Sequence, residues 1–291
     1  MGVAHSRPKG VAQFSESNRV RAPLRGRPFL SETRLAGGDG GVNQQDLIDE
    51  FRKMLAESAR VVVFTGAGIS TESGIPDFRS PGGIWTKYQP IDFREFMSFD
   101  EARRETWRRK IAVDEAVSQA QPNRGHRAIT HLVARGKVSS VITQNIDGLH
   151  QKSGIPDEQT IELHGNGTYA TCLECAKRYE LAHLFTAFKV NEEPPVCDCG
   201  GFIKSATISF GQPMPFEAMR RAQAESLSCD LFIAIGSSLV VYPAASFPAV
   251  AKQNGSRLVI LNREPTDLDY LADLVLNLEI GATLGEVTGV E

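Results

Sequence analysis

Residues 61–70 of this 291-residue chain read VVVFTGAGIS. The first four are apolar, three of them are β-branched, and small residues follow directly, which is typical of a buried parallel strand that passes into a helix. Small residues at such a turn allow the backbone to approach a pyrophosphate near a helix N-terminus. The pattern is weak by itself, because a tight turn that binds no ligand reads the same way.

Four further stretches share the character of residues 61–64, and they are 138–143, 231–235, 257–261 and 274–278. Helical apolar spacing occurs between or beside several of them, at 43–58, 124–134 and 244–253. Strands that alternate with helices predict a doubly wound parallel sheet. We therefore expect an α/β, Rossmann-like fold.

Two regions interrupt this alternation and are expected to be insertions. Residues 75–120 begin with a loop rich in Pro, Gly and aromatic residues and continue with Arg-rich helical spacing, whereas residues 167–210 hold four of the five cysteines. Ligands of open α/β sheets bind outside the carboxyl ends of the strands, and both insertions are expected to overhang that crevice. The predicted domain covers 43–291, with a Rossmann-like core of about 43–74, 121–166 and 211–291.

Residues 1–42 precede this domain and are expected to be a disordered or targeting leader. They carry seven Lys or Arg against three Asp or Glu, which leaves 25 against 32 in the remainder of the chain. The predicted domain thus has no basic field, so we expect no direct contact with nucleic acid. No apolar run approaches the roughly 20 residues of a membrane-spanning helix, so no span is expected. A start of Met1-Gly2 with Ser6 fits the permissive myristoylation pattern and leaves lipid anchoring as a minor alternative.

The spacing of the cysteines indicates the redox state of the compartment in which the protein works. Four of the five lie close together in sequence, which suits a metal site in a reducing compartment better than a disulfide framework. We expect a cytoplasmic protein, or one of the mitochondrial matrix if the source is eukaryotic. The sequence does not determine the oligomeric state, and a monomer is the expectation.

The turn at 65–70 does not support hydride transfer. Its sequence TGAGIS is not G-x-G-x-x-G, and no acidic residue ends a second strand about 20 residues later to hold a ribose. A nicotinamide-dependent dehydrogenase is therefore disfavoured.

Five motifs in order along the chain resemble the signatures of the sirtuins, the NAD-dependent protein deacylases. They are ESGIPDFRS at 72–80, TQNIDGLH at 143–150, ELHG at 162–165, GSSL at 236–239 and LNREP at 261–265. The resemblance implies a sirtuin catalytic domain over 43–291, with NAD as co-substrate. The cofactor-binding residues that it implies are Gly66, Ala67, Ser70, Pro76, Asp77, Phe78, Arg79, Gln144, Asn145, Ile146, Asp147, Gly236, Ser237, Ser238, Asn262 and Arg263.

His164 follows an apolar strand expected at 159–163, where it would face the crevice. A histidine titrates near pH 6.5 and can take a proton from a ribose hydroxyl at physiological pH. A lone histidine at a strand end is usually structural, but within these motifs we interpret His164 as the catalytic base. His150 lies in the second motif and is interpreted as a packing or hydrogen-bonding residue.

Gln144, Asn145 and Asp147 follow a central strand, where amide and carboxylate groups can hydrogen-bond a ribose and a carboxamide. The alternative for Asp147 is a turn cap. The resemblance implies that Asn145 takes part in catalysis and that Asp147 marks the nicotinamide pocket. It further implies that Phe78 and Arg79 cover the nicotinamide ribose.

Cys172, Cys175, Cys197 and Cys199 supply four thiolates, the number that closes a tetrahedral structural zinc site. The second pair is C-x-C where many sirtuins have C-x2-C, which puts the local geometry in doubt. A redox-active dithiol is the competing interpretation.

Ile208, Ser209, Phe210 and Gly211 resemble the sirtuin segment that pairs with an extended acyl-lysine peptide by strand addition. One sirtuin subgroup prefers acidic acyl groups and carries a Tyr-x-x-Arg pair, whereas the corresponding residues at 107–110 read WRRK. A succinyl preference is therefore not supported. Trp107 and Phe96 either line a long acyl tunnel or fill a core, and core packing is preferred.

The function predicted is that of an NAD-dependent protein-lysine deacylase, which releases nicotinamide and an O-acyl-ADP-ribose. Its cofactors are NAD and one structural zinc ion, and its partners are acylated protein lysines. Two alternatives stay open: a protein mono-ADP-ribosyltransferase and a non-catalytic NAD-sensing module. The sequence does not identify the preferred acyl chain or the protein targets.

Overall fold

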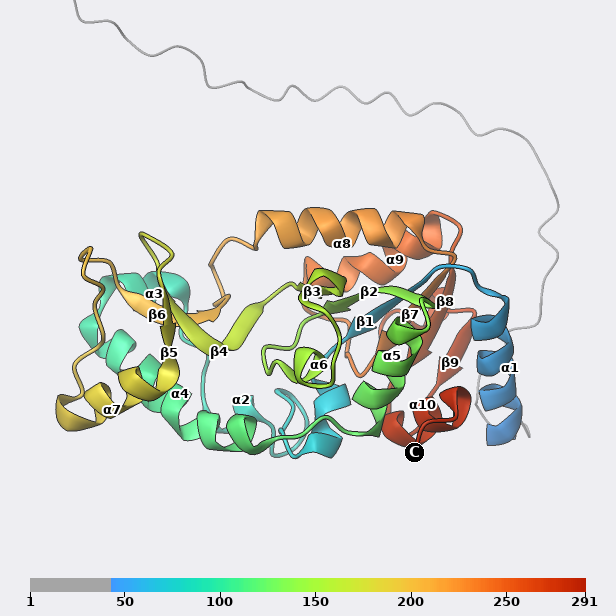
Figure 1. Cartoon of the computed structure of the whole chain (residues 1–291), viewed down its shortest axis with the longest axis horizontal. Coiled ribbons are helices and arrows are strands. Elements are labelled where there is room, and N and C mark those ends of the chain that lie inside the picture. Colours follow the sequence, from blue (N-terminus) through green and yellow to red (C-terminus); the bar gives the residue numbers. More distant parts are fainter. Residues whose placement is uncertain (1–42) are drawn as a thin grey trace, which may run out of the picture. The chain divides into compact units, whose positions relative to one another are not determined.

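The structure is a computed structural model that describes residues 43–291. The leader predicted for residues 1–42 lies outside the described residues. Within the described part of the chain, no helix is both long and apolar enough to cross a membrane. The strands form a six-stranded sheet and a three-stranded sheet (Figure 1).

The larger sheet is parallel throughout, with the strand order β3-β2-β1-β7-β8-β9. Its strands are β1 Val61–Thr65, β2 Val138–Thr143, β3 Thr160–Glu162, β7 Leu231–Ile235, β8 Arg257–Leu261 and β9 Leu274–Leu276. The chain passes from β1 to β2 and β3 on one side, and returns to β7 on the other. Ligands bind at such a reversal of strand order. The prediction of a doubly wound α/β fold is confirmed.

Helices cover both faces of this sheet, because successive side chains of a strand point to opposite faces. Val61 and Val63 of β1 pack in one cluster with α1, α5 and α10, whereas Val62 and Phe64 pack in another with α8 and α9. Figure 1 shows α8 and α9 above the sheet and α10 below it. These helices are α1 Gln44–Glu57, α5 Arg124–Ala134, α8 Phe216–Ser228, α9 Phe247–Gln253 and α10 Ile280–Thr288.

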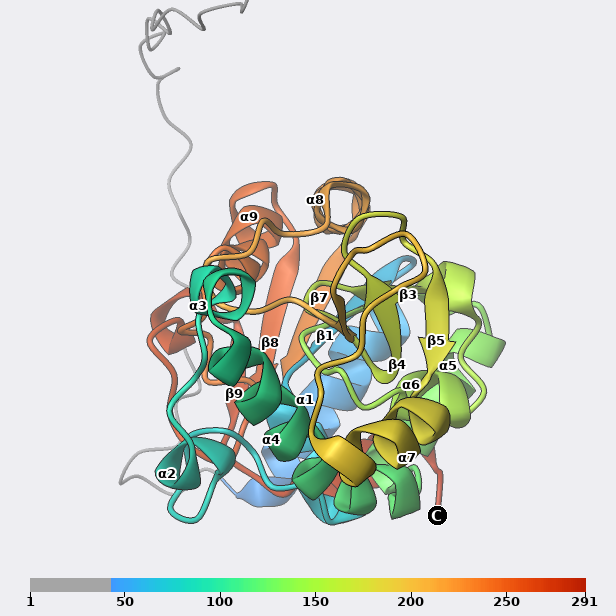
Figure 2. The same ribbon diagram turned by 90° about the vertical axis from the view of Figure 1, so that its left-hand side faces the viewer.

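The second sheet is antiparallel, with the order β5-β4-β6. It lies beside the helices of the first predicted insertion (Figure 2). The elements of this part are α2 Ile84–Lys87, α3 Phe93–Ser98, α4 Asp100–Gln119, β4 Gly165–Cys172, β5 Arg178–Glu180, α7 Leu181–Asn191 and β6 Ile203–Thr207. Short turns of helix complete the elements of residues 43–291, and they are η1 Ala67–Ser73, α6 Leu149–Lys152, η2 Asp157–Gln159, η3 Ala244–Ser246 and η4 Asp269–Leu271.

The two predicted insertions share one hydrophobic cluster. Trp107 of α4 is 1% exposed and packs with Phe188 of α7, Ile203 of β6 and the buried cysteine Cys172. Phe96 of α3 is also 1% exposed. Both aromatic side chains therefore fill cores, which confirms the preferred interpretation, and α4 folds together with the cysteine-bearing sheet.

Candidate active site

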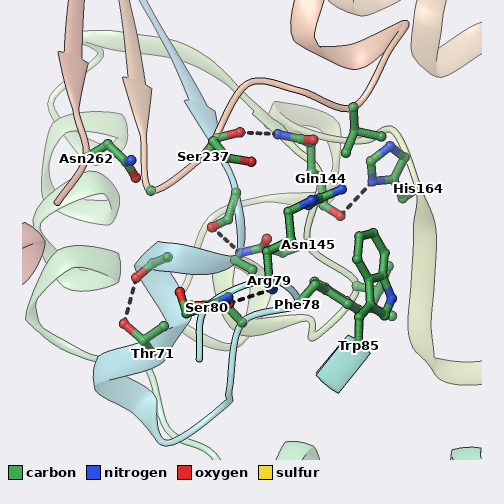
Figure 3. A pocket seen from close by; sticks show the side chains of 18 of the residues that line it. Thr71, Phe78, Arg79, Ser80, Trp85, Gln144, Asn145, His164, Ser237 and Asn262 are labelled. Carbon is green, nitrogen blue, oxygen red and sulfur yellow. Dashed lines mark hydrogen bonds between the residues drawn. The ribbon is translucent and has the colours of Figure 1, made fainter. Parts of the chain in front are cut away.

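A cavity of about 610 Å³ opens at the carboxyl ends of β1, β2, β7 and β8, and residues that follow β3 and β6 complete its walls (Figure 3). Most of the residues predicted to bind cofactor or substrate line it. They are Gly66, Ala67, Asp77, Phe78, Arg79, Gln144, Asn145, Ile146, His164, Ile208, Ser209, Phe210, Gly211, Gly236, Ser237, Ser238, Asn262 and Arg263. Three predicted cofactor-binding residues are not among the lining residues: Ser70, Pro76 and Asp147.

Ser70 and Asp147 support Asn145 from behind the cavity wall. Ser70 Oγ donates to Asp147 Oδ2 at 2.7 Å and accepts from Asn145 Nδ2 at 3.2 Å. Asn145 Nδ2 also donates to the carbonyl oxygen of Gly66 at 3.1 Å. Both amide hydrogens of Asn145 are thereby used, which leaves Oδ1 as its acceptor for a ligand.

The glycines after β1 and β7 are needed for contact between two backbone turns. A Cβ on Gly66 would lie 2.7 Å from the carbonyl oxygen of Gly236, and one on Gly68 would lie 2.8 Å from Cα of Gly236. Gly236 itself has φ +62°, which favours glycine. The small residues that predicted a phosphate-binding turn are therefore also required by the packing of the turns that form the cavity.

His164 is oriented by a backbone carbonyl. Its Nδ1 lies 3.1 Å from the carbonyl oxygen of Gln144, which can only accept, so Nδ1 carries the hydrogen in the neutral ring. Nε2 is then the basic nitrogen. Burial lowers the pKa of His164 below its ordinary value; the hydrogen bond to Gln144 opposes this shift, and the positive charge of Arg79 adds to it. The ring is therefore neutral and basic at physiological pH.

Gln144 connects two of the turns that form the cavity. Its backbone N–H donates to the carbonyl oxygen of Thr65 at 2.9 Å, and its Nε2 donates to Ser237 Oγ at 2.7 Å. The same residue orients His164 through its carbonyl oxygen. Gln144 therefore couples the turn after β7 to the position of the histidine (Figure 3).

The predicted substrate segment lies beyond β6, which ends at Thr207. The Ile208 N–H donates to the carbonyl oxygen of His164, and the Phe93 N–H donates to that of Phe210, both at 2.8 Å. A turn closes the segment, since the Gln212 N–H donates to the carbonyl oxygen of Ser209 at 3.0 Å. Within residues 43–291 the Gly211 N–H has no partner, which leaves it available to a ligand.

The four paired cysteines converge at one point of the smaller sheet. Their Sγ atoms all lie within 4.8 Å of one another, with Cys172 Sγ 3.5 Å from Cys199 Sγ and Cys175 Sγ 3.6 Å from Cys197 Sγ. A zinc ion with bonds of about 2.3 Å to four tetrahedral sulfurs sets the sulfurs about 3.8 Å apart. The C-x-C pair therefore fits a tetrahedral site, and none of the four residues lines the cavity.

The surroundings act differently on the thiols of this cluster: a backbone N–H from Gly201 acts to lower the pKa of Cys199, but the neighbouring sulfurs raise it to about 12. A backbone N–H from Cys199, followed by the Tyr179 hydroxyl, lowers the pKa of Cys197 to about 6. The hydroxyl lies 3.0 Å from the sulfur. Zinc ligands and redox-active thiols both have lowered pKa values, so it is the convergence of four sulfurs that favours a structural zinc ion over a redox-active dithiol.

Comparison with known proteins identifies the family. The model of the Sir2 family matches residues 66–243. The chain is 56% identical over 242 residues to an NAD-dependent protein deacetylase 1 of Bradyrhizobium diazoefficiens, which covers 83% of this chain and 95% of the relative. The chain belongs to the Sir2 family. An NAD-dependent protein deacetylase of Rhodopseudomonas palustris is 54% identical over 243 residues, covering 83% of this Sir2-family chain and 96% of the relative.

A solved structure of a Sir2 protein with a p53 peptide and NAD+ superposes on this Sir2-family chain. The TM-score is 0.76 at 37% sequence identity, and the match covers 83% of this chain and 97% of the other. The resemblance to the sirtuins drawn from five short motifs is thereby confirmed over most of residues 43–291. The four-cysteine cluster of this Sir2-family chain is consistent with the predicted structural zinc.

Sequence reasoning missed two aromatic residues that line the cavity of this Sir2-family chain, Trp85 and Tyr242. The Trp85 ring lies 5.5 Å from that of Phe78 and 5.6 Å from that of Phe210, and the Arg79 guanidinium carbon lies 4.2 Å from its centre. The position of Trp85, five residues after the cofactor-loop motif at 72–80, was the available signal. The three rings and Arg79 form one wall of the cavity.

Proposed function

We propose that this Sir2-family chain is an NAD-dependent protein-lysine deacylase that releases nicotinamide and an O-acyl-ADP-ribose. The observation that carries the proposal is His164, which lies on the cavity wall with Nδ1 held by the Gln144 carbonyl and Nε2 left as the base. The deacetylases among its relatives, and the Sir2 structure with a peptide and NAD+, support the same activity.

The residues present fit NAD. Backbone turns rich in small residues follow β1 and β7, Asn145 offers a free acceptor, and Asn262 and Arg263 follow β8. We assign the carboxamide and its ribose to Asn145, Phe78 and Arg79, and the phosphates to the turns that hold Gly66 and Ser237. When bound, NAD supplies an activated ribose carbon and a hydroxyl that receives the acyl group.

His164 accepts the proton of this hydroxyl at Nε2. The charged ring keeps its Nδ1–H bond to the Gln144 carbonyl, which stabilises the charge without a change of position. The wall formed by Phe78, Trp85 and Phe210 excludes water from the same space. These residues supply positioning and general-base catalysis, which are worth several kcal/mol of barrier lowering.

We assign the peptide of the acylated protein to residues 208–211. The free Gly211 N–H offers a backbone donor, and the Ile208–His164 hydrogen bond keeps the segment next to the base. Pairing through the backbone discriminates little between side chains.

The base predicts a defined pH dependence. His164 must be neutral to act, and burial lowers its pKa below the ordinary histidine value of about 6.5. We expect the acidic limb of kcat/KM to have a midpoint below 6.5, with activity falling only as the pH drops through that value. In Arg79→Gln the limb should shift to higher pH, because a positive charge near the ring is removed. A wild-type midpoint above 6.5 would contradict this assignment.

The proposed function is tested by nicotinamide release from NAD with acetyl-, propionyl-, succinyl- and long-chain acyl-lysine peptides. We expect release that depends on the peptide, with mass-spectrometric detection of the O-acyl-ADP-ribose product. Release without an acyl peptide, together with ADP-ribose attached to protein, would indicate a transferase instead. No release with any peptide, despite NAD binding, would indicate a non-catalytic sensor.

A further inference from the structure

A row of buried polar side chains lies behind Asn145. Thr65 ends β1 with 0% exposure, Thr143 ends β2 with 2%, and His150 of α6 has 2%. His150 Nε2 lies 2.8 Å from Thr65 Oγ1, Thr65 Oγ1 donates to Thr143 Oγ1 at 2.8 Å, and the Asn145 N–H donates to Thr143 Oγ1 at 3.0 Å. The row therefore joins α6 to the backbone of Asn145 through the ends of two neighbouring strands.

The single hydroxyl hydrogen of Thr65 decides which atom donates in each of these hydrogen bonds. The Thr65 hydroxyl has one hydrogen and donates it to Thr143, so its contact with His150 requires His150 to be the donor. His150 must then carry its hydrogen on Nε2. Burial lowers the pKa of His150 to about 4, so the ring is neutral at physiological pH and has a single N–H to give.

Packing alone does not explain the hydroxyl groups of Thr65 and Thr143. Valine has nearly the shape of threonine, favours strands at least as well, and buries no hydroxyl. Thr65 and Thr143 nevertheless face each other in the parallel register of β1 and β2, next to the turn that carries Gln144 and Asn145. A buried hydroxyl at this place accepts the Asn145 N–H, which would otherwise be a buried donor without a partner.

We propose that His150 is a positioning residue, which acts through Thr65 and Thr143 to hold Asn145 for the nicotinamide end of NAD. The inference rests on the proposed function, because it takes Asn145 as part of the NAD site. The side chain of Asn145 is held separately by Gly66 and Ser70, so its backbone is the part that this row controls. His126 packs against His150, with ring centres 5.2 Å apart, and limits its movement.

The first test compares variants of Thr143 in the full chain. Thr143→Val keeps the shape and removes the acceptor, and we expect KM for NAD to rise about tenfold, the cost of about one buried hydrogen bond. Thr143→Ser, which keeps the hydroxyl, should restore KM to within about twofold of the wild type. Thr160→Val is the matched control, since its buried hydroxyl bonds to the Pro156 carbonyl and has no link to Asn145.

A double-mutant cycle tests whether the row acts as a unit. Thr65→Val and His150→Leu should each raise KM for NAD. The KM of the double variant should not exceed that of the more impaired single variant, because both changes break the same connection. Strictly additive effects, or equal KM values for the valine and serine variants of Thr143, would overturn the proposal.

The tautomer of His150 provides a test that does not depend on variants folding or on activity. Histidine-labelled protein examined by ¹⁵N NMR should show the hydrogen of His150 on Nε2, and a hydrogen on Nδ1 would overturn the inference. Failure of the proposed function is distinguishable, because it would show as wild-type protein that releases no nicotinamide while His150 keeps the Nε2 hydrogen.

Discussion

His164→Ala is expected to reduce turnover by about 10²–10⁴-fold, the usual contribution of a general base. The variant removes Nε2, the nitrogen that is left basic because Nδ1 donates to the Gln144 carbonyl. The carboxylates that line the cavity cannot replace it; Asp77, for example, has a pKa below its ordinary value although burial acts to raise it, because hydrogen bonds from Ser80 and Arg79 outweigh burial. Nicotinamide release under single-turnover conditions measures the loss.

NAD binding by His164→Ala should stay within a few-fold of the wild type. The turns that would hold the cofactor are fixed by other contacts, including Gln144 to Ser237 and the glycine packing of the turns after β1 and β7. The matched control is His183→Ala, which removes an exposed histidine of α7 and should leave kcat and KM unchanged. Full turnover by the His164 variant would remove the basis of the proposed mechanism.

Cys197→Ser is expected to unfold the smaller sheet together with α4. Structural zinc contributes about 10–16 kcal/mol in small zinc-binding peptides, which is comparable with the whole stability of a domain. Cys197 and Cys172 lie in the same buried cluster as Trp107, so loss of the ion removes the support of that cluster. Because β6 continues into residues 208–211 and β4 follows His164, activity should be lost as well.

Trp107 provides the readout for this second prediction. The chain has two tryptophans, so a Trp85→Phe background reports Trp107 alone. Its emission should shift to the red in Cys197→Ser, with bound zinc falling from one ion per chain to none by elemental analysis. Cys229→Ser is the control, because Cys229 packs against the larger sheet and should retain zinc and blue emission. Unchanged emission in the zinc-free variant would contradict the structural role.

Local patterns in the sequence were sufficient to predict the fold class. The apolar runs at 61–64 and 231–235 predicted buried parallel strands, and every residue of β1 and β7 is buried. Periodicity was less reliable at element ends, since the strand expected at 274–278 ends at Leu276 and the helix expected at 244–253 is divided into η3 and α9. Hydrophobic spacing reports which side chains are buried, whereas the last hydrogen bond of an element depends on its neighbours.

The sequence predicted those residues of the candidate site whose side chains belong to a recognisable motif. Motifs and cysteine spacing pointed to residues that line one cavity or form one sulfur cluster. They did not separate lining residues from supporting ones, and Ser70 and Asp147 proved to stand behind Asn145. Trp85 was missed because α2, the helix that carries it, has only four residues and is too short to show a periodic apolar pattern.

Apolar strands, small-residue turns, one histidine at a strand end and four thiols at short spacings are local features, and the sequence alone was enough to recognise them. How these parts act on one another depends on contacts that form only in the folded chain. The Gln144 carbonyl selects the basic nitrogen of His164, and Trp107 of α4 joins the core of the cysteine-bearing sheet. A backbone carbonyl is the same at every residue, and contacts between distant segments leave no local pattern. Such interactions become visible only when folding brings the segments together.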